Sequence, residues 1–171
     1  MTPAARNAFA AAKAIDIDVR RELGPPEEGL LAATHSVIPR SLLRGTRGYL
    51  EKVANQASGC YENGWYDGCA VVMRRLIETL IIESFEKHGI AARIKSPQGE
   101  FLFLKDLVTR CASESTWNLS RNCKQALPKL KDLGDKSAHS RRYVAQRGDL
   151  DPLLPDIRVS VQELVYLAGL K

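Results

Sequence analysis

The chain has 171 residues, of which 44% are hydrophobic and 26% are charged, and its formal net charge is +5 at pH 7. This length suits one domain with a real core and an extension, and the composition is ordinary for a globular protein. The longest apolar run is short and is interrupted by Arg74, Arg75 and Glu78. The N-terminus lacks the continuous apolar stretch of a signal peptide. We therefore expect a cytoplasmic protein that spans no membrane.

The four cysteines do not have the spacing of a zinc site, because no CxxC pair occurs. Without a secretion signal, they are expected to be reduced thiols that lie mostly in the core. The sequence therefore predicts no bound metal and no other cofactor. The cysteines are Cys60, Cys69, Cys111 and Cys123.

The first third of the chain predicts helices separated by glycine and proline. Residues 3–23 are rich in helix formers and end at Gly24-Pro25-Pro26. We assign residues 1–39 to an N-terminal helical extension. Ser41 can cap a helix that runs past Gly45 and Gly48 to Ala57, and Asn63-Gly64 then breaks it.

Residues 65–88 give the strongest helix prediction. Apolar side chains recur there at three-to-four spacing, which is typical of a helix that packs into a core. Gly89 is a suitable C-terminal stop. Trp65, Tyr66 and nearby Tyr61 form an aromatic cluster that either stacks on bases or closes one end of the core. The apolar positions are Cys69, Val72, Met73, Leu76, Ile77, Leu80, Ile81 and Phe85.

The segments between residues 91 and 140 predict a polar loop over 91–100 and two further helices. Residues 101–111 form the first, with Phe101, Leu104 and Val108 on one face. Asn118 or Ser120 caps the second, which covers residues 121–140. Pro128 lies inside this helix and predicts a kink or a split there.

The chain ends in a basic loop over residues 141–149 and a helix that opens at Asp151-Pro152. This last helix has a clean apolar stripe, formed by Ile157, Val161, Leu164, Val165 and Ala168. No segment shows the sustained alternation of a strand. The sequence therefore predicts an all-α fold, an up-and-down helical bundle over residues 40–171.

Charge is concentrated between residues 121 and 147. Eight basic residues face only Asp132 and Asp135 there, so the net charge of this stretch is +6 and that of the remaining sequence is −1. Such a stretch is the usual electrostatic footprint of a phosphate-bearing partner, although a solvated helix face has the same composition. The basic residues are Arg121, Lys124, Lys129, Lys131, Lys136, Arg141, Arg142 and Arg147.

Arg74, Arg75 and Glu78 form a charged cluster on the predicted core helix. Their spacing of three and four residues allows local ion pairs on the helix surface. Alternatively, the two arginines project into a cleft and bind phosphate, and Glu78 orients a catalytic group there.

His139 is a second candidate site, near the end of the helix over 121–140. Metal-independent RNA cleavage needs a group that transfers protons near neutral pH and a cation that stabilises charge on the phosphate. His139 with Lys136, Arg141 and Arg142 has these side chains. The alternative is a structural histidine that is hydrogen-bonded near a helix end.

These two segments together resemble a bacterial domain of unknown function in the HEPN clan. Arg74-Arg75-Leu76-Ile77-Glu78 is similar to its arginine-plus-Leu-x-Glu signature, and Leu133 to His139 is similar to its Gly-Asn-x-x-Ala-His segment. The resemblance covers residues 41–168. It implies a helical bundle that often forms a homodimer. Many HEPN proteins are metal-independent endoribonucleases of toxin–antitoxin and antiphage systems.

The HEPN catalytic motif combines an arginine, a polar residue and a later histidine. His139 matches the histidine and Asp135 the polar residue, but Gly134, Leu133 and Asp132 fill the positions of the arginine, and Lys131 lies one residue too far back. The resemblance then implies a module that binds RNA, a nucleotide or another phosphate-rich ligand in a defence or stress system. The alternatives are an active endoribonuclease in which Lys131, Arg74 or Arg75 replaces the arginine, and a noncatalytic subunit that binds a protein partner or dimerises.

Overall fold

The computed structural model describes residues 2, 4, 5, 7, 9–15 and 37–171. Residues 4, 5, 7 and 9–15 are helical and exposed, which agrees with the first part of the helix predicted over 3–23. The rest of that prediction lies outside the described residues.

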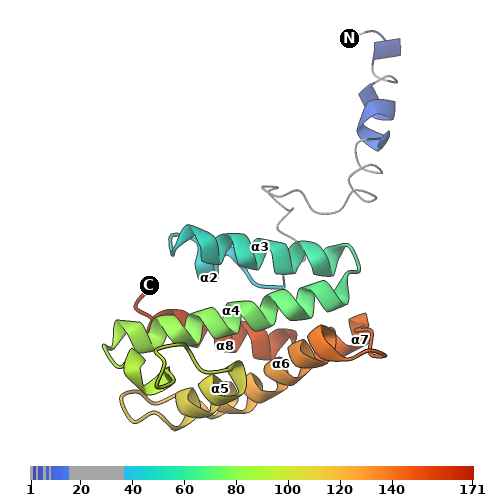
Figure 1. Ribbon diagram of the computed structural model, residues 1–171. Coiled ribbons are helices and arrows are strands. Elements are labelled where there is room, and N and C mark those ends of the chain that lie inside the picture. Colours follow the sequence, from blue (N-terminus) through green and yellow to red (C-terminus); the bar gives the residue numbers. More distant parts are fainter. Residues whose placement is uncertain (1, 3, 6, 8, 16–36) are drawn as a thin grey trace.

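Residues 37–171 form a bundle of helices, which confirms the all-α prediction (Figure 1). Among the described residues there is no β-strand, and Lys95 and Phe101 form an isolated bridge. The α-helices are α2 (Arg40–Leu43), α3 (Gly48–Glu62), α4 (Tyr66–Lys87), α5 (Leu104–Ser113), α6 (Arg121–His139), α7 (Arg147–Leu150) and α8 (Leu154–Leu167). Two 3-10 helices, η1 (Ala91–Ile94) and η2 (Asp151–Leu153), complete them.

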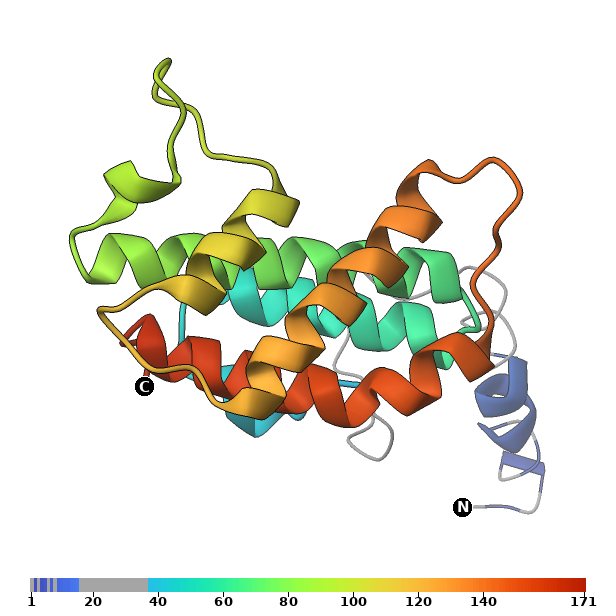
Figure 2. The ribbon, with the colours of Figure 1, turned by 90° about the horizontal axis from the view of Figure 1, so that it is seen from below.

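Helix α4 is the central element of the bundle, as its apolar spacing predicts. It packs against α3, α5, α6 and α8, and α6 also packs on α8 (Figures 1 and 2). Gly64, with φ +77°, precedes α4, and Gly89, with φ +69°, follows it, so both predicted breaks are confirmed. Of its predicted apolar positions, all except Val72 are buried, and Val72 packs on the edge of the core.

The single helix predicted between residues 41 and 57 is wrong, because the chain forms two helices there. Gly45 adopts φ +80°, a left-handed conformation that interrupts helical hydrogen bonding between α2 and α3. Ser41 lies inside α2 and does not cap it, since Pro39 occupies the N-cap position. Val37 and Ile38 are buried in the core, so core packing begins before residue 40.

The helix predicted from residue 101 starts three residues later. Phe101 is held in the bridge with Lys95 and is 39% exposed, so it does not share a helix face with Leu104 and Val108. Those two side chains are buried in α5, as predicted. The polar loop predicted over 91–100 contains η1.

Helix α6 has a predicted N-cap residue and continues through its internal proline. The Ser120 hydroxyl accepts a hydrogen bond from the Cys123 backbone N–H at 3.1 Å, which confirms Ser120 as the N-cap. The helix is not split at Pro128, because buried Leu127 and Leu130 fix its neighbours in the core. Pro128 itself is exposed, so water can reach the carbonyl that loses its helical partner.

The C-terminal part of the bundle has more elements than predicted. The loop over 141–149 contains the start of α7, and the predicted helix from Asp151 is divided into η2 and α8. Every residue of the predicted apolar stripe in this last helix is buried. The position of the stripe was therefore correct although the helix start was not.

The cysteines are free, and Cys69, Cys111 and Cys123 are buried. Burial raises the pKa of each of these three thiols to about 12, so they remain protonated at neutral pH. No group of three or more His, Cys, Asp and Glu side chains capable of holding a metal occurs among the described residues. None of the helices within the described part of the chain has the length and apolar character needed to cross a membrane.

Candidate functional site

Helices α4 and α6 are in close contact where Gly134 faces Arg74. A Cβ atom added to Gly134 would lie 2.6 Å from the Arg74 Cβ, which is too close for any side chain. An arginine at position 134, as in the HEPN motif, would therefore force the two helices apart. The aliphatic part of Arg74 lies over Gly134, in the space that a side chain at that position would fill.

Arg74 belongs to a group of ionised side chains between α4 and α6, which we call the Arg74 cluster. It consists of Arg74, Glu78, Lys131, Asp132 and Asp135. The Nε atom of Arg74 donates to Oδ1 of Asp135 at 2.7 Å, and its Nη1 atom donates to Oε2 of Glu78 at 3.3 Å. Nζ of Lys131 lies 2.9 Å from Oδ2 of Asp135 and 2.9 Å from Oδ1 of Asp132.

The Arg74 cluster is partly covered, with Asp132 at its exposed edge, and its charges neutralise one another. The side chains of Arg74, Lys131 and Asp135 are 24%, 19% and 30% exposed. Burial raises the pKa of Asp135, but hydrogen bonds from Arg74 and Lys131 outweigh it and hold this pKa below its usual value. Hydrogen bonds to Asp132 and Asp135 raise the pKa of Lys131. Two cations then face three carboxylates, so the Arg74 cluster offers no surplus positive charge to a phosphate.

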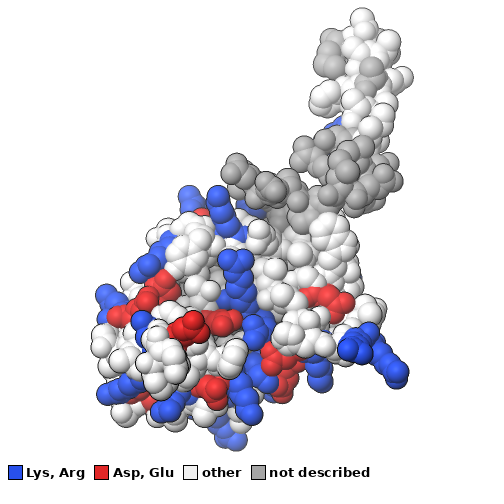
Figure 3. Space-filling view, in the orientation of Figure 1, with Lys and Arg blue, Asp and Glu red and all other residues white. Residues whose placement is uncertain are grey.

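The other predicted phosphate-binding residues differ from Arg74 in this respect. Arg75, Lys136, Arg141 and Arg142 are exposed, and none of them has an ion-pair partner among residues 37–171. Figure 3 shows acidic and basic side chains interspersed on the face in view. Lys136, Arg141 and Arg142 therefore form a group of exposed cations without ion pairs at the end of α6. Among the described residues, Arg121 and Lys124 at the start of α6 are also exposed and without ion pairs.

His139 is the last residue of α6 and is exposed. It has no hydrogen-bond partner within the described part of the chain, so the structural role of a hydrogen-bonded histidine is not observed. Asp135 and Lys136 precede it by four and three residues, which places both one helical turn away on the same side of α6. His139 thus lies one turn from the carboxylate that holds Arg74.

The loop that follows α6 is tied to the start of α4. The backbone N–H of Ala145 donates to Oδ1 of Asp67 at 3.0 Å. Trp65, two residues before Asp67, is 44% exposed, whereas Tyr61 is buried and packs edge-on against Tyr66 with ring centroids 5.7 Å apart. Of the predicted aromatic cluster, Trp65 therefore has a surface available for stacking, and the two tyrosines close the end of the core.

Sequence reasoning paired Arg74 with Glu78, and this ion pair is present. It missed the contact between Arg74 and Asp135, because nothing in either segment states that the two helices touch. Gly134 was the available signal of this contact, because a residue without a side chain lets the helix that carries Arg74 come close. No known protein family, curated protein or solved structure matches the chain.

Proposed function

We propose that the chain is a HEPN-like module that binds RNA through the end of α6 and the loop after it. The RNA-binding surface comprises Lys136, His139, Arg141 and Arg142. The observation that carries the proposal is the contrast in charge pairing: Arg74 and Lys131 are neutralised, whereas Lys136, Arg141 and Arg142 are exposed without ion pairs among the described residues. The resemblance to HEPN proteins supports a role in a bacterial toxin–antitoxin or antiphage system.

RNA fits this surface better than a small anion does. Exposed guanidinium and ammonium groups bind successive phosphates of a chain, and each contact releases counterions. Trp65 is exposed at the end of α4 to which the loop is attached, so it offers a ring on which a base can stack. A single-stranded RNA can use both contacts at once.

Fluorescence anisotropy with a labelled single-stranded RNA at low salt tests the proposal. We expect the double variant Arg141→Gln/Arg142→Gln to weaken binding about tenfold or more, because two phosphate contacts are lost. The control Arg121→Gln/Lys124→Gln removes the same charge from the opposite end of α6 and should change binding by less than about threefold. Equal weakening by both variants, or no binding by the unaltered protein, would contradict the proposal.

A second candidate is a metal-independent endoribonuclease, and the position of Arg74 favours it. Arg74 occupies the place that Gly134 leaves open, and it is bonded to Asp135, one turn from His139. In such an enzyme the His139 imidazole would accept the proton of the attacking 2′-hydroxyl or donate one to the leaving oxygen. Arg74 would stabilise the negative charge on the phosphate, which requires its ion pair with Asp135 to open when RNA binds.

Cleavage of total RNA in EDTA tests this candidate. An endoribonuclease of this kind cleaves in EDTA, loses activity in His139→Ala and loses most of it in Arg74→Gln. No cleavage by the unaltered protein excludes the enzyme and leaves the RNA-binding module. Equal cleavage by the unaltered protein and His139→Ala would point to a contaminating nuclease.

A further inference from the structure

A second positively charged site lies at the opposite end of α4 from the RNA-binding surface, between η1 and the end of α5 (Figure 1). It is a pocket of about 260 Å³. Two arginines, two serines and one glutamate line it: Arg93, Arg110, Ser113, Glu114 and Ser115. Neither the Arg74 cluster nor the proposed RNA contacts involve these residues.

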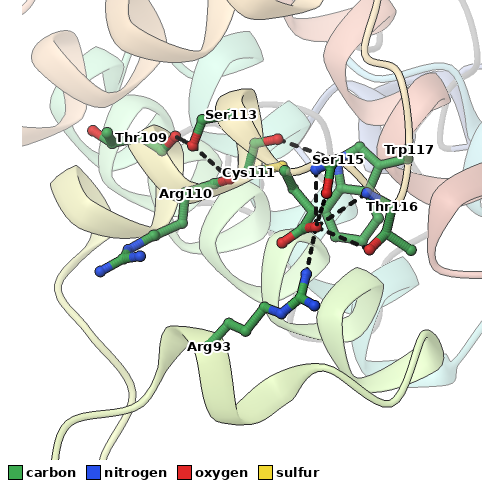
Figure 4. Close-up of polar contacts among 9 residues, drawn as sticks. Arg93, Thr109, Arg110, Cys111, Ser113, Ser115, Thr116 and Trp117 are labelled. Carbon is green, nitrogen blue, oxygen red and sulfur yellow. Dashed lines mark hydrogen bonds and ion pairs between the residues drawn. The ribbon is translucent and has the colours of Figure 1, made fainter.

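Glu114 forms one wall of the pocket. Its Oε1 atom accepts hydrogen bonds from Nη1 of Arg93 at 2.6 Å, from the backbone N–H groups of Ser115 and Thr116 at 2.9 and 3.0 Å, and from the Thr116 hydroxyl at 2.9 Å (Figure 4). The Glu114 side chain is 7% exposed. The Glu114 carboxylate is therefore hydrogen-bonded by Arg93 and by the loop residues Ser115 and Thr116. Little of this carboxylate is exposed to a ligand in the pocket.

Two guanidinium groups remain available to a ligand. Arg93 is 53% exposed and uses one of its nitrogens for Glu114, so other N–H groups of the same fork are free to donate. Arg110 lies in the last turn of α5 and is exposed. Its guanidinium has no hydrogen bond or ion pair within the described ranges, and no dashed line reaches it in Figure 4. The net charge of the pocket lining is +1.

We propose that this pocket binds a phosphate group of a small molecule, with Arg93 and Arg110 as the two cationic donors. Guanidinium groups match the oxygens of a phosphate with paired hydrogen bonds. Ser115 lies at the same wall, where its hydroxyl donates to Oε1 of Glu114 at 3.5 Å. The volume is below the usual range of about 300–1,000 Å³ for drug-sized ligands, so the pocket fits the phosphate group, and the organic part of a monoester would lie outside it.

Arg110 also has a simpler role that the test must separate from ligand binding. A cation in the last turn of a helix interacts favourably with the helix dipole, whether or not a ligand binds. Arg110→Gln removes both the interaction with the helix dipole and the contact with a ligand. It keeps every hydrogen bond drawn in Figure 4, because Arg110 contributes only its backbone carbonyl to these bonds. Lys105→Gln removes one positive charge from the same helix outside the pocket and is the matched control.

Calorimetric titration of the full chain with inorganic phosphate and, separately, with adenosine monophosphate tests the site. We expect saturable binding of both, weakened about tenfold by Arg110→Gln and by Arg93→Gln, and unchanged in Lys105→Gln. Tighter binding of adenosine monophosphate would identify an organic monoester as the ligand, and equal binding would identify the free anion. Absence of saturable binding by the unaltered protein, or equal loss in Lys105→Gln, would overturn the proposal.

A thermal melt of each variant completes the test. Arg93→Gln also removes a bond to Glu114 and can loosen the loop, so the decision rests on Arg110→Gln. If Arg110→Gln lowers the melting temperature slightly and leaves phosphate binding unchanged, the residue only serves the helix end and the proposal fails. RNA affinity should be unchanged in Arg110→Gln, which keeps the failure of this site distinct from failure of the RNA-binding surface.

Discussion

At the scale of single residues, Gly134 sets the distance between α4 and α6. A methyl group there would meet the Arg74 Cβ at 2.6 Å, and a Cβ cannot rotate away. Alanine is favoured over glycine in a helix by about 1 kcal/mol, but overpacking a tight interface costs about 1–3 kcal/mol. We expect Gly134→Ala to lower the free energy of unfolding by up to about 2 kcal/mol, measured by urea denaturation.

Gly148→Ala is the matched control for this prediction. Gly148 lies in α7, and a Cβ there would have no neighbour within 4 Å. Its substitution should therefore leave the free energy of unfolding unchanged or raise it by a few tenths of a kcal/mol, about the helix preference of alanine. If Gly134→Ala proves as stable as Gly148→Ala, α4 and α6 are not in close contact at that residue.

Glu114 gives a residue-scale prediction for pH. Burial raises its pKa, but hydrogen bonds from Thr116 and Arg93 outweigh burial and lower it to about 2, against an ordinary value of 4.5. A carboxylate with a lowered pKa in the folded state stabilises it fully above pH 4.5, and the contribution is lost as pH falls from there toward 2. We expect Glu114→Gln to melt at a lower temperature than the unaltered protein at pH 7. The difference should shrink as pH falls below 4.5, and a difference independent of pH would contradict this assignment.

At the scale of elements, the Arg74 cluster joins α4 to α6. Arg74 and Asp135 are 24% and 30% exposed, so their ion pair is better shielded from water than a surface pair. A double-mutant cycle with Arg74→Gln and Asp135→Asn should give a coupling energy of about 1 kcal/mol, measured by urea denaturation. A cycle with Lys129→Gln and Asp156→Asn, whose lysine is 57% exposed, should give less. Equal coupling in the two cycles would show that shielding adds nothing to the pair between α4 and α6.

How far the sequence predicts an element depends on how local its determinants are. The buried face of α4 and the Ser120 cap of α6 were predictable, because spacing and capping act within a few residues. The break at Gly45 was not predicted, since the apolar pattern continues across it. The contact between Arg74 and Asp135 and the pocket at Arg93 and Arg110 depend on which helices pack together, and no local pattern states that.

At the scale of the whole molecule, a net charge of +5 is less informative than which cations are free. The structure pairs Lys131 with two carboxylates and Lys129 with Asp156, so several of the basic residues between 121 and 147 are neutralised locally. The sequence located the basic stretch correctly but could not state which of its cations face a ligand. The partners of Lys131 lie on its own helix, whereas the partner of Lys129 lies on α8, far away in the chain.

The number of free cations gives a quantitative prediction for RNA binding. For single-stranded nucleic acid, the logarithm of the association constant falls with the logarithm of salt concentration with a slope of about −0.7 per phosphate contact. Lys136, Arg141 and Arg142 together predict a slope of about −2, and Arg141→Gln/Arg142→Gln should reduce it to about −0.7. Titrations of RNA binding at several salt concentrations measure both slopes. A slope near −3.5 in the unaltered protein would correspond to five contacts, as expected if Arg74 and Lys131 of the Arg74 cluster also contact RNA, which requires the ion pairs of Asp135 to open on binding.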